Sequence, residues 1–414
     1  IPHSRESAVP ILRTVMRLPS VVITTYSISQ WQNVYGPLEK KWLRVICLSG
    51  IRMTKIKITL LSLFLVLIPL SIANSQTTSK LKYIEFNEIG NPADVLKVKE
   101  EKSRSLKSSE VRVRVLAVPI NPSDLLQISG NYGVEPILPS TPGKEGIGRV
   151  LEISSEVKHL KVGQLVLLAG GRNGTWRNEI VAPASEFLPL PDMGPLDSDM
   201  IDQLSMTAVN PLTALLMLNK FVDLQEGQWI IQSASNSAVG GYVIQLAKQR
   251  GIKTINVVRR QGLDKDLLAK GADVVLIDGP DLVEKISNAT DGSPIMLALD
   301  AVGGETYTRL ANSLGYGGTL IAYGVLSGKE ATLNTGLTIL NDLRLRSFWL
   351  TKWYEKAGIK DVQAAFEIII PMIAKGDLKA NIDSRFNLDE IEEAVSRAGQ
   401  GGRSGKVLIV PNAQ

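Results

Sequence analysis

The fold of this chain is decided by residues 230–241, which read IIQSASNSAVGG. Residues 229–232 are a short apolar strand, and residues 240–250 are a predicted helix that ends at Gly251. A strand that runs directly into a helix points backbone N–H groups and the positive end of the helix dipole at one place. The stretch therefore predicts a site for an anionic group such as a pyrophosphate.

The same stretch departs from the three-glycine pattern of dinucleotide-binding turns. Only the last glycine is kept, and small hydroxyl and amide residues stand where the earlier ones would be. Such side chains still allow close approach and can donate hydrogen bonds. The candidate pyrophosphate loop consists of Ser235, Asn236, Ser237, Ala238, Val239 and Gly240. An ordinary strand–helix junction is the alternative.

Strands and helices alternate through the second half of the chain. Strands are expected at 254–258, 274–277, 295–300 and 319–323, and helices at 263–270, 282–288 and 305–314. This alternation predicts an α/β fold with a doubly wound parallel sheet of the Rossmann type, over 206–345. Residues 80–205 lean towards β structure, with a loop-rich stretch at 117–148, and the tail at 346–414 is expected to contain helix, helix and strand.

Residues 1–75 differ from this body in composition. After Met53 come two lysines, a mostly apolar run over 58–72 and the small residues Ala73-Asn74-Ser75, a pattern typical of a secretory signal peptide at 53–75. The run spans about 15 residues, against roughly 20 for a membrane-spanning helix, and an uncleaved anchor is the alternative. Residues 1–52 are expected to be an upstream or unstructured extension. If the signal peptide is used, the protein is expected to be periplasmic or secreted; otherwise it is expected to be cytoplasmic. Contact with a membrane is expected only if the signal segment is retained.

The formal charge of +5 comes from this N-terminal segment. Nine Lys/Arg and two acidic residues lie in 1–75, which leaves 37 basic and 39 acidic residues in the rest of the chain. That balance argues against nucleic acid as a partner of the body. The sequence has one cysteine, Cys47, and two histidines, His3 and His159, so the body lacks the ligands of a zinc site and no metal is expected.

The strand expected at 254–258 is followed by Arg259 and Arg260. An acidic residue at this place would bind a ribose 2′-hydroxyl and select NAD, whereas arginine pairs with a 2′-phosphate. The position therefore favours NADPH as the cofactor. A solvated basic turn is the alternative.

Several short motifs occur in a fixed order along the body. They are NPSD at 121–124, GNYG at 130–133, GTW at 174–176, NPLTA at 210–214, QSASNS at 232–237, NVVR at 256–259 and FWL at 348–350. Together they resemble the trans-2-enoyl-thioester (enoyl-CoA and enoyl-ACP) reductases of the medium-chain dehydrogenase/reductase superfamily; the first motif also occurs in quinone oxidoreductases. The resemblance implies a GroES-like catalytic domain built from 80–205 and the tail, a Rossmann domain inserted between them, and a homodimer.

Zinc members of that superfamily carry a Gly-His-Glu motif where this chain reads GKEG at 143–146, so the resemblance is to the zinc-free members. Without a metal, the chemistry needs a substrate that is already polarised, such as an α,β-unsaturated thioester or ketone. Hydride addition at the β-carbon leaves an enolate that must be protonated. Tyr132 matches the family's proton donor, and a phenol with the ordinary pKa of about 10 can donate at neutral pH. A packing tyrosine is the alternative.

The resemblance also implies the remaining cofactor contacts. Arg259 matches the ligand of the 2′-phosphate, with Arg260 beside it, and Lys406 matches a lysine near the phosphates. Asn210 matches a residue of the same cofactor site. The nicotinamide would be lined by two segments, Tyr323, Gly324, Val325 and Leu326, and Phe348, Trp349, Leu350 and Thr351. Core packing is the alternative for Trp349, and a local Asx turn explains Asn121 and Asp124 equally well.

The sequence thus predicts NADPH-dependent reduction of an activated C=C bond, most readily in a trans-2-enoyl thioester. Two other functions stay open. One is a quinone or enone/alkenal reductase of the same superfamily. The other is a catalytically idle NADPH-binding protein.

Overall fold

The computed structural model describes residues 16–18, 21–23, 80–169 and 174–412. Near the start of the chain, β1 (Met16–Leu18) and β2 (Val21–Ile23) form an antiparallel pair, within the stretch expected to be an unstructured extension. The signal peptide expected at 53–75 lies outside the described residues. Within the described part, no helix combines the length and apolarity needed to cross a membrane.

A parallel sheet forms around the turn at 230–241, as predicted. In the described part of the chain it has six strands in the order β12-β11-β10-β13-β14-β15, all parallel. The chain begins in the middle, moves to one edge and then crosses to the other, which is the doubly wound arrangement. The strands are β10 (Trp229–Gln232), β11 (Lys253–Val258), β12 (Val274–Ile277), β13 (Ile295–Asp300), β14 (Thr319–Ala322) and β15 (Arg344–Ser347). The expected fold class is confirmed.

Helices cover both faces of this sheet. The helices between and before its strands are α4 (Asn210–Lys220), α5 (Ala238–Gln249), α6 (Asp264–Lys270), α7 (Leu282–Ala289), α8 (Gly304–Asn312) and α9 (Thr335–Leu340). Neighbouring residues of β10 face opposite cores: Ile230 packs with Val243 of α5, and Ile231 packs with Leu310 of α8. Because side chains alternate along a strand, an apolar strand such as β10 requires cover on both sides.

The other sheet joins the first part of the body to its tail. Seven described strands form it, in the order β16-β17-β5-β6-β7-β9 with β8 also paired to β5. They are β5 (Glu110–Pro119), β6 (Glu145–Ile153), β7 (Leu165–Ala169), β8 (Glu179–Pro183), β9 (Phe187–Pro189), β16 (Ile382–Phe386) and β17 (Lys406–Ile409). β3 (Lys80–Glu85) and β4 (Lys97–Lys102) form a separate hairpin. The parallel sheet is therefore inserted between two parts of a β-rich unit.

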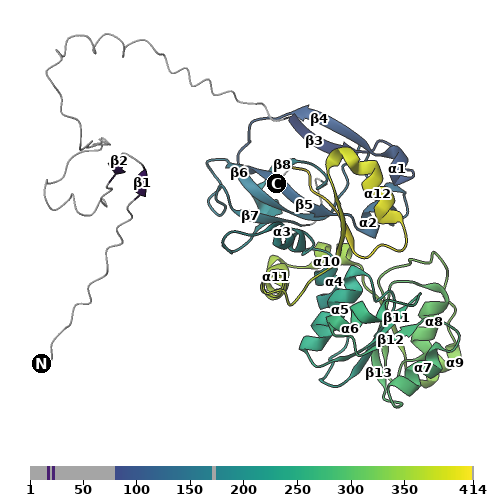
Figure 1. Cartoon of the computed structure of the whole chain (residues 1–414). Coiled ribbons are helices and arrows are strands. Elements are labelled where there is room, and N and C mark those ends of the chain that lie inside the picture. Colours follow the sequence, from purple (N-terminus) through teal and green to yellow (C-terminus); the bar gives the residue numbers. More distant parts are fainter. Residues whose placement is uncertain (1–15, 19–20, 24–79, 170–173, 413–414) are drawn as a thin grey trace, which may run out of the picture. The chain divides into compact units, whose positions relative to one another are not determined.

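The remaining helices pack around these sheets. They are α1 (Pro92–Val95), α2 (Pro122–Ile128), η2 (Ala184–Glu186), α3 (Ser198–Ser205), α10 (Leu350–Lys356), α11 (Ile359–Ala374), η3 (Leu388–Glu390) and α12 (Ile391–Gly399). In Figure 1 the C-terminal α12, in yellow, lies beside α1 and α2. One apolar cluster runs from Ile147 of β6 through Leu204 of α3 and Phe366 of α11 to Ile230 of the parallel sheet.

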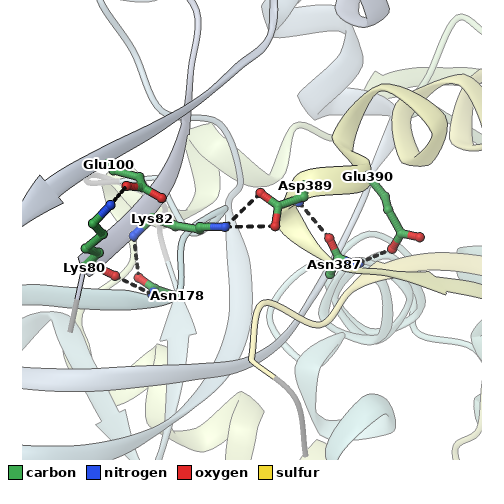
Figure 2. A network of polar contacts seen from close by, with 7 residues as sticks. All are labelled: Lys80, Lys82, Glu100, Asn178, Asn387, Asp389 and Glu390. Carbon is green, nitrogen blue, oxygen red and sulfur yellow. Dashed lines mark hydrogen bonds and ion pairs between the residues drawn. The ribbon is translucent and has the colours of Figure 1, made fainter. Parts of the chain in front are cut away.

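A polar network ties the first strand of the body to the tail (Figure 2). Lys82 Nζ lies 2.9 Å from Asp389 Oδ2, although the two residues are 307 apart in the chain. The backbone N–H of Lys82 donates to Asn178 Oδ1 over 2.9 Å. On the tail side, the backbone N–H of Asn387 donates to Glu390 Oε2 over 2.8 Å, which holds the turn that carries Asp389. The network closes the β-rich unit by joining β3 to η3.

The stretch 117–148 is loop with short elements, as expected: β5 continues to Pro119, α2 occupies Pro122–Ile128 and β6 begins at Glu145, while residues 129–144 lie outside helices and strands. The expectation for the tail was incomplete. The tail contains α10 and β16 in addition to the expected helix, helix and strand. The residues of β16 read IDSRF and are half-buried for the most part, so no apolar alternation marks them. β16 forms because β17 offers it a partner edge.

Candidate functional site

The junction between β10 and α5 has the geometry of an anion-binding turn. Ser237 caps α5, and its Oγ accepts a hydrogen bond from the N–H of Gly240 over 3.1 Å. A Cβ added at Gly240 would lie 2.5 Å from the carbonyl oxygen of Ser235, so only glycine allows this approach of loop and helix. The N–H groups of Ala238 and Val239, in the first turn of the helix, remain for an external anion.

The side chains of this loop divide into two groups. Ser235 is buried, and its Oγ lies 3.1 Å from the carbonyl oxygen of Gln232 and 3.2 Å from that of Val257. Its hydroxyl therefore holds the loop against β11, and only its backbone could face a ligand. Asn236 is exposed and Ser237 is half-buried. The side chain of Asn236 is thus open to solvent, whereas the hydroxyl of Ser235 points into the fold.

The segment 323–326 lies at the end of β14, next to β13. The N–H of Leu326 donates to the carbonyl of Ala301 over 2.9 Å, and a Cβ at Gly324 would lie 2.9 Å from that same oxygen. Burial raises the pKa of the Tyr323 phenol, which is therefore neutral. Val325 and Leu326 are 67% and 60% exposed and leave an apolar surface at the carboxyl edge of the sheet. That edge is where doubly wound sheets bind their ligands.

Arg259 and Arg260 follow β11 directly and are both exposed. Arg260 Nη2 lies 3.5 Å from the carbonyl oxygen of Gly402, in the turn before β17. β11 is the neighbour of β10 in the sheet, so its end lies beside the pyrophosphate turn. The structure thus places two cations where the sequence predicted the 2′-phosphate site.

Tyr132 lies in the loop after α2, far from the parallel sheet in sequence, yet it meets the segment 348–351. Trp349 Nε1 donates to Tyr132 Oη over 3.0 Å, and Thr351 Oγ1 shares a hydrogen bond with the same oxygen over 2.9 Å. The two rings meet edge to face at 5.6 Å between centroids. Tyr132 is half-buried, so its hydroxyl is fixed by two side chains without being sealed off.

The other two residues of that segment lie elsewhere. Phe348 is buried and packs edge to face on Phe221 at 6.2 Å. Leu350 is half-buried against the main apolar cluster. Of the four residues, Trp349 and Thr351 therefore contact the candidate proton donor, and Phe348 serves the core.

The side chains of Asn210 and Lys406 both contact Asn121, for which the sequence suggested a local turn. Asn121 Oδ1 accepts from Asn210 Nδ2 over 3.0 Å and from Lys406 Nζ over 2.6 Å. Its Nδ2 donates to Glu145 Oε1 over 2.8 Å, and Glu145 Oε2 accepts from the N–H of Val209 over 2.8 Å. All four side chains are buried. We call Asn121, Glu145, Asn210 and Lys406 the Asn121 network.

Burial sets the charge state of this network. It raises the pKa of Glu145 to about 7, against the opposing pull of Lys406. It also lowers the pKa of Lys406 to about 8, although the Glu145 carboxylate works in the other direction. Desolvation disfavours a buried charge of either sign, and the two groups limit that cost by facing each other through Asn121.

Sequence reasoning missed Glu145 and the hub role of Asn121. The available signal was the stretch GKEG, which stands where zinc enzymes carry Gly-His-Glu and keeps a glutamate at the start of a buried strand. Asn121 does take part in a local turn, since its N–H donates to Asp124 Oδ2 over 2.8 Å. In this turn it is the Asp124 side chain that accepts, whereas the Asn121 side chain contacts Asn210, Lys406 and Glu145, so the interpretation as a local Asx turn did not account for it. Among the described residues, no three His, Cys, Asp or Glu side chains gather as a metal site would require.

Two family descriptions match the chain. Residues 107–192 match "Alcohol dehydrogenase GroES-like domain", and residues 238–369 match "Zinc-binding dehydrogenase". Mitochondrial enoyl-acyl-carrier-protein reductases are similar over most of their length. The Rattus norvegicus enzyme is 37% identical over 322 residues, which are 77% of this chain and 85% of the relative. The Homo sapiens enzyme is 35% identical over 344 residues, which are 82% of this chain and 91% of the relative.

Solved structures agree with these matches. The Etr1p/NADP/crotonyl-CoA complex has a TM-score of 0.73 at 28% identity, covering 80% of this chain and 99% of its own. The mitochondrial 2-enoyl thioester reductase Etr1p/Etr2p heterodimer from Candida tropicalis also has a TM-score of 0.73 at 28% identity, and the match covers 80% of this chain and 99% of that one. A quinone oxidoreductase from Pseudomonas syringae has a TM-score of 0.69 at 25% identity, and the match covers 80% of this chain and 100% of that one.

Proposed function

The chain belongs to the enoyl-acyl-carrier-protein reductase family within the medium-chain dehydrogenase/reductase superfamily, and on that premise we propose that it reduces trans-2-enoyl thioesters with NADPH, with Tyr132 as the proton donor. The observation that carries the proposal is the placement of the Tyr132 hydroxyl, 3.0 Å from Trp349 Nε1 and 2.9 Å from Thr351 Oγ1. A packing tyrosine has no need of two polar partners on its hydroxyl. A proton donor needs them, because they hold the oxygen in place and stabilise it once the proton has left.

The residues at the β10–α5 junction fit a dinucleotide. The absence of a Cβ at Gly240 lets the loop backbone at Ser235 lie against the start of α5, and the N-terminus of α5 offers backbone donors to a pyrophosphate. Arg259 would hold the 2′-phosphate, and the segment 323–326 would line the nicotinamide. When bound there, NADPH supplies the hydride that the β-carbon of the substrate accepts.

The protein's own part is the protonation that follows. The α-carbon of the enolate takes the proton, the O–H bond of Tyr132 breaks, and the electron pair stays on the phenol oxygen. That oxygen accepts the N–H of Trp349 throughout and can also accept the hydroxyl proton of Thr351. The Trp349 N–H is in place before the reaction, so its stabilisation of the phenolate requires no reorganisation.

The test is the oxidation of NADPH by the wild-type protein with a crotonyl thioester. Tyr132→Phe should lower kcat about 100-fold or more, as expected for loss of a general acid. Tyr316→Phe is a matched control at a residue that is 73% exposed, and it should leave kcat unchanged. The proposal is wrong if wild type binds NADPH, turns over no enoyl thioester and is unaffected by Tyr132→Phe.

A quinone or enone reductase is the second candidate, favoured by the similarity to the Pseudomonas syringae quinone oxidoreductase. The same assay separates the two. Turnover of quinones or short enones without turnover of crotonyl thioester would replace the first proposal by the second. Turnover of neither class would leave an NADPH-binding protein without catalysis.

The choice of NADPH over NADH is proposed to rest on Arg259. Arg259→Ala should weaken NADPH binding by about tenfold or more and leave NADH binding unchanged, because a guanidinium–phosphate pair is lost only with NADPH. Arg260→Ala is the comparison, since Arg260 also contacts the carbonyl of Gly402. Equal losses for NADPH and NADH on Arg259→Ala would exclude a 2′-phosphate contact.

The active form is proposed to be a homodimer that uses the β15 edge of the parallel sheet. Among the described strands, β15 pairs only with β14, and Ile339 and Leu340 of the neighbouring α9 are 73% and 75% exposed. An unpaired strand edge beside exposed apolar side chains is suited to self-association. Light scattering should give a dimer for wild type and a monomer for Leu340→Lys. A wild-type monomer would refute this assembly.

The location of the protein is proposed to depend on residues 53–75. Export requires cleavage before Gln76, whereas the relatives are described as mitochondrial. Mass spectrometry of the N-terminus of the native protein separates these routes. A first residue of Gln76 supports export, and a chain that still contains 53–75 argues against it.

A further inference from the structure

Lys144 lies directly over the ring of Tyr132. Its Nζ is 3.2 Å from the ring centroid, and both side chains are half-buried. The ring is thus contacted on its face by a cation and at its edge by Trp349. A cation attracts the face of an aromatic ring, and the attraction grows when both groups are shielded from water.

The backbone on both sides of Lys144 is held in place. Gly143 has φ +98°, and a Cβ there would lie 2.3 Å from Thr175 Oγ1, so the chain is held tightly on that side. On the other side, Glu145 is fixed in the Asn121 network. Lys144 Nζ also lies 3.4 Å from the carbonyl oxygen of Ser123. The ammonium is therefore held over Tyr132 by its contacts with the ring and with the carbonyl oxygen of Ser123.

A buried carboxyl group lies on the same side. Asp124 is fully buried; its Oδ2 accepts the N–H of Asn121, and its Oδ1 has no hydrogen-bond partner in the described part of the structure. Burial raises the pKa of Asp124, and among the groups that oppose this rise the charge of Lys144 is the strongest. The charge of Lys144 thus acts on a buried acid, and its ammonium also contacts the ring of the candidate proton donor.

We infer that Lys144 is a positioning residue for the proton transfer, and that its ammonium stabilises the phenolate that Tyr132 becomes. The inference rests on the proposed function. Before the transfer, the ammonium meets a neutral ring and is attracted only by its quadrupole. After the O–H bond has broken, the ring shares a full negative charge and the attraction increases. An interaction that strengthens along the reaction lowers the barrier and acts on kcat rather than on KM.

A double-mutant cycle on the full-length protein tests this role. Lys144→Met removes the charge and keeps the chain length, and it should lower kcat for crotonyl thioester about tenfold with KM changed less than about twofold. In the Tyr132→Phe background, where no phenolate forms, the same substitution should have no further effect on the single-turnover rate. Lys144→Arg should restore most of the rate. Lys253→Met is the matched control, because Lys253 lies over the ring of Trp229 at 5.2 Å and should leave kcat unchanged.

Other outcomes would overturn the inference. An equal loss of rate in the wild-type and Tyr132→Phe backgrounds would show that Lys144 does not act through the phenol. A raised KM with unchanged kcat would assign it to substrate binding. If Lys144→Met does not fold, Lys144→Gln carries the same prediction, with circular dichroism as the check. Wild-type protein without activity on enoyl thioesters would remove the proposed function itself, whereas normal wild-type turnover with an additive cycle removes only the role of Lys144.

Discussion

Gly240 and Gly241 are neighbours in the first turn of α5, yet their surroundings predict opposite effects of alanine. A Cβ at Gly240 would lie 2.5 Å from the carbonyl oxygen of Ser235 and 2.7 Å from its carbonyl carbon and Cα. Real contacts of a Cβ essentially never fall below 3.0 Å, so the backbone of the loop would have to move by about 0.5 Å. A Cβ at Gly241 would meet its nearest neighbours at 3.8 Å and 4.0 Å, which is ordinary contact.

The magnitudes follow from two effects. Alanine is favoured over glycine in a helix by up to about 1 kcal/mol, and this gain is shared by Gly240→Ala and Gly241→Ala. Overpacking costs about 1–3 kcal/mol and falls on Gly240→Ala only. The two variants should therefore differ in their free energy of unfolding by about 1–3 kcal/mol, with Gly241→Ala equal to or more stable than wild type. Because the displaced loop is the candidate pyrophosphate site, Gly240→Ala should also bind NADPH about tenfold or more weakly.

Two measurements check this pair. Urea unfolding followed by tryptophan fluorescence gives the stability of each variant, and a fluorescence titration with NADPH gives the dissociation constant. Gly241→Ala is the control in both, since it has the same chemistry one residue away. If Gly240→Ala matched Gly241→Ala in stability and in NADPH affinity, neither the close approach nor its link to the cofactor could be correct.

Three further predictions concern the same region. Burial raises the pKa of Glu145 from 4.5 to about 7, so the folded chain holds this proton more tightly than the unfolded chain. The free energy of unfolding should therefore fall as the pH rises from about 4.5 to about 7 and then level off. Glu145→Gln should flatten that slope, which is measured from urea midpoints across this pH range. Ser237→Ala removes the cap of α5 and should cost about 1 kcal/mol in urea unfolding, and a loss near zero would mean that the cap is not formed. Trp349→Phe removes the donor to Tyr132 and should lower kcat about three- to tenfold at unchanged NADPH affinity, whereas an unchanged kcat would exclude a role for this hydrogen bond.

The residues that sequence reasoning placed well are those defined by local order along the chain. The strand at 229–232 is found as expected, and α5 begins two residues before the expected start. Arg259 was expected at the end of the next strand, and it does follow β11 directly. These features depend on a run of apolar residues, a turn and a helix in succession, so the sequence is sufficient to indicate them.

Contacts between segments that are distant in the sequence could not be predicted in this way. Asn121 meets Asn210 across 89 residues and Lys406 across 285, and no local pattern marks any of the three as partners. The resemblance to a family had assigned Asn210 and Lys406 to the cofactor. The structure shows that both side chains contact Asn121, in a buried network with Glu145 that the resemblance did not indicate.

By itself, the sequence determined the doubly wound sheet and the strand–turn–helix junction between β10 and α5, and it indicated the tyrosine that is expected to donate a proton. The tertiary structure decided what surrounds that tyrosine: Trp349 and Thr351 on its hydroxyl and Lys144 over its ring. The physical reason is the range of the interactions. Helix and strand periods are set by neighbours in the chain. The groups around the hydroxyl and the ring of Tyr132 come from the residue before β6 and from the start of α10, more than 200 residues apart in sequence, and they meet only when the chain has folded.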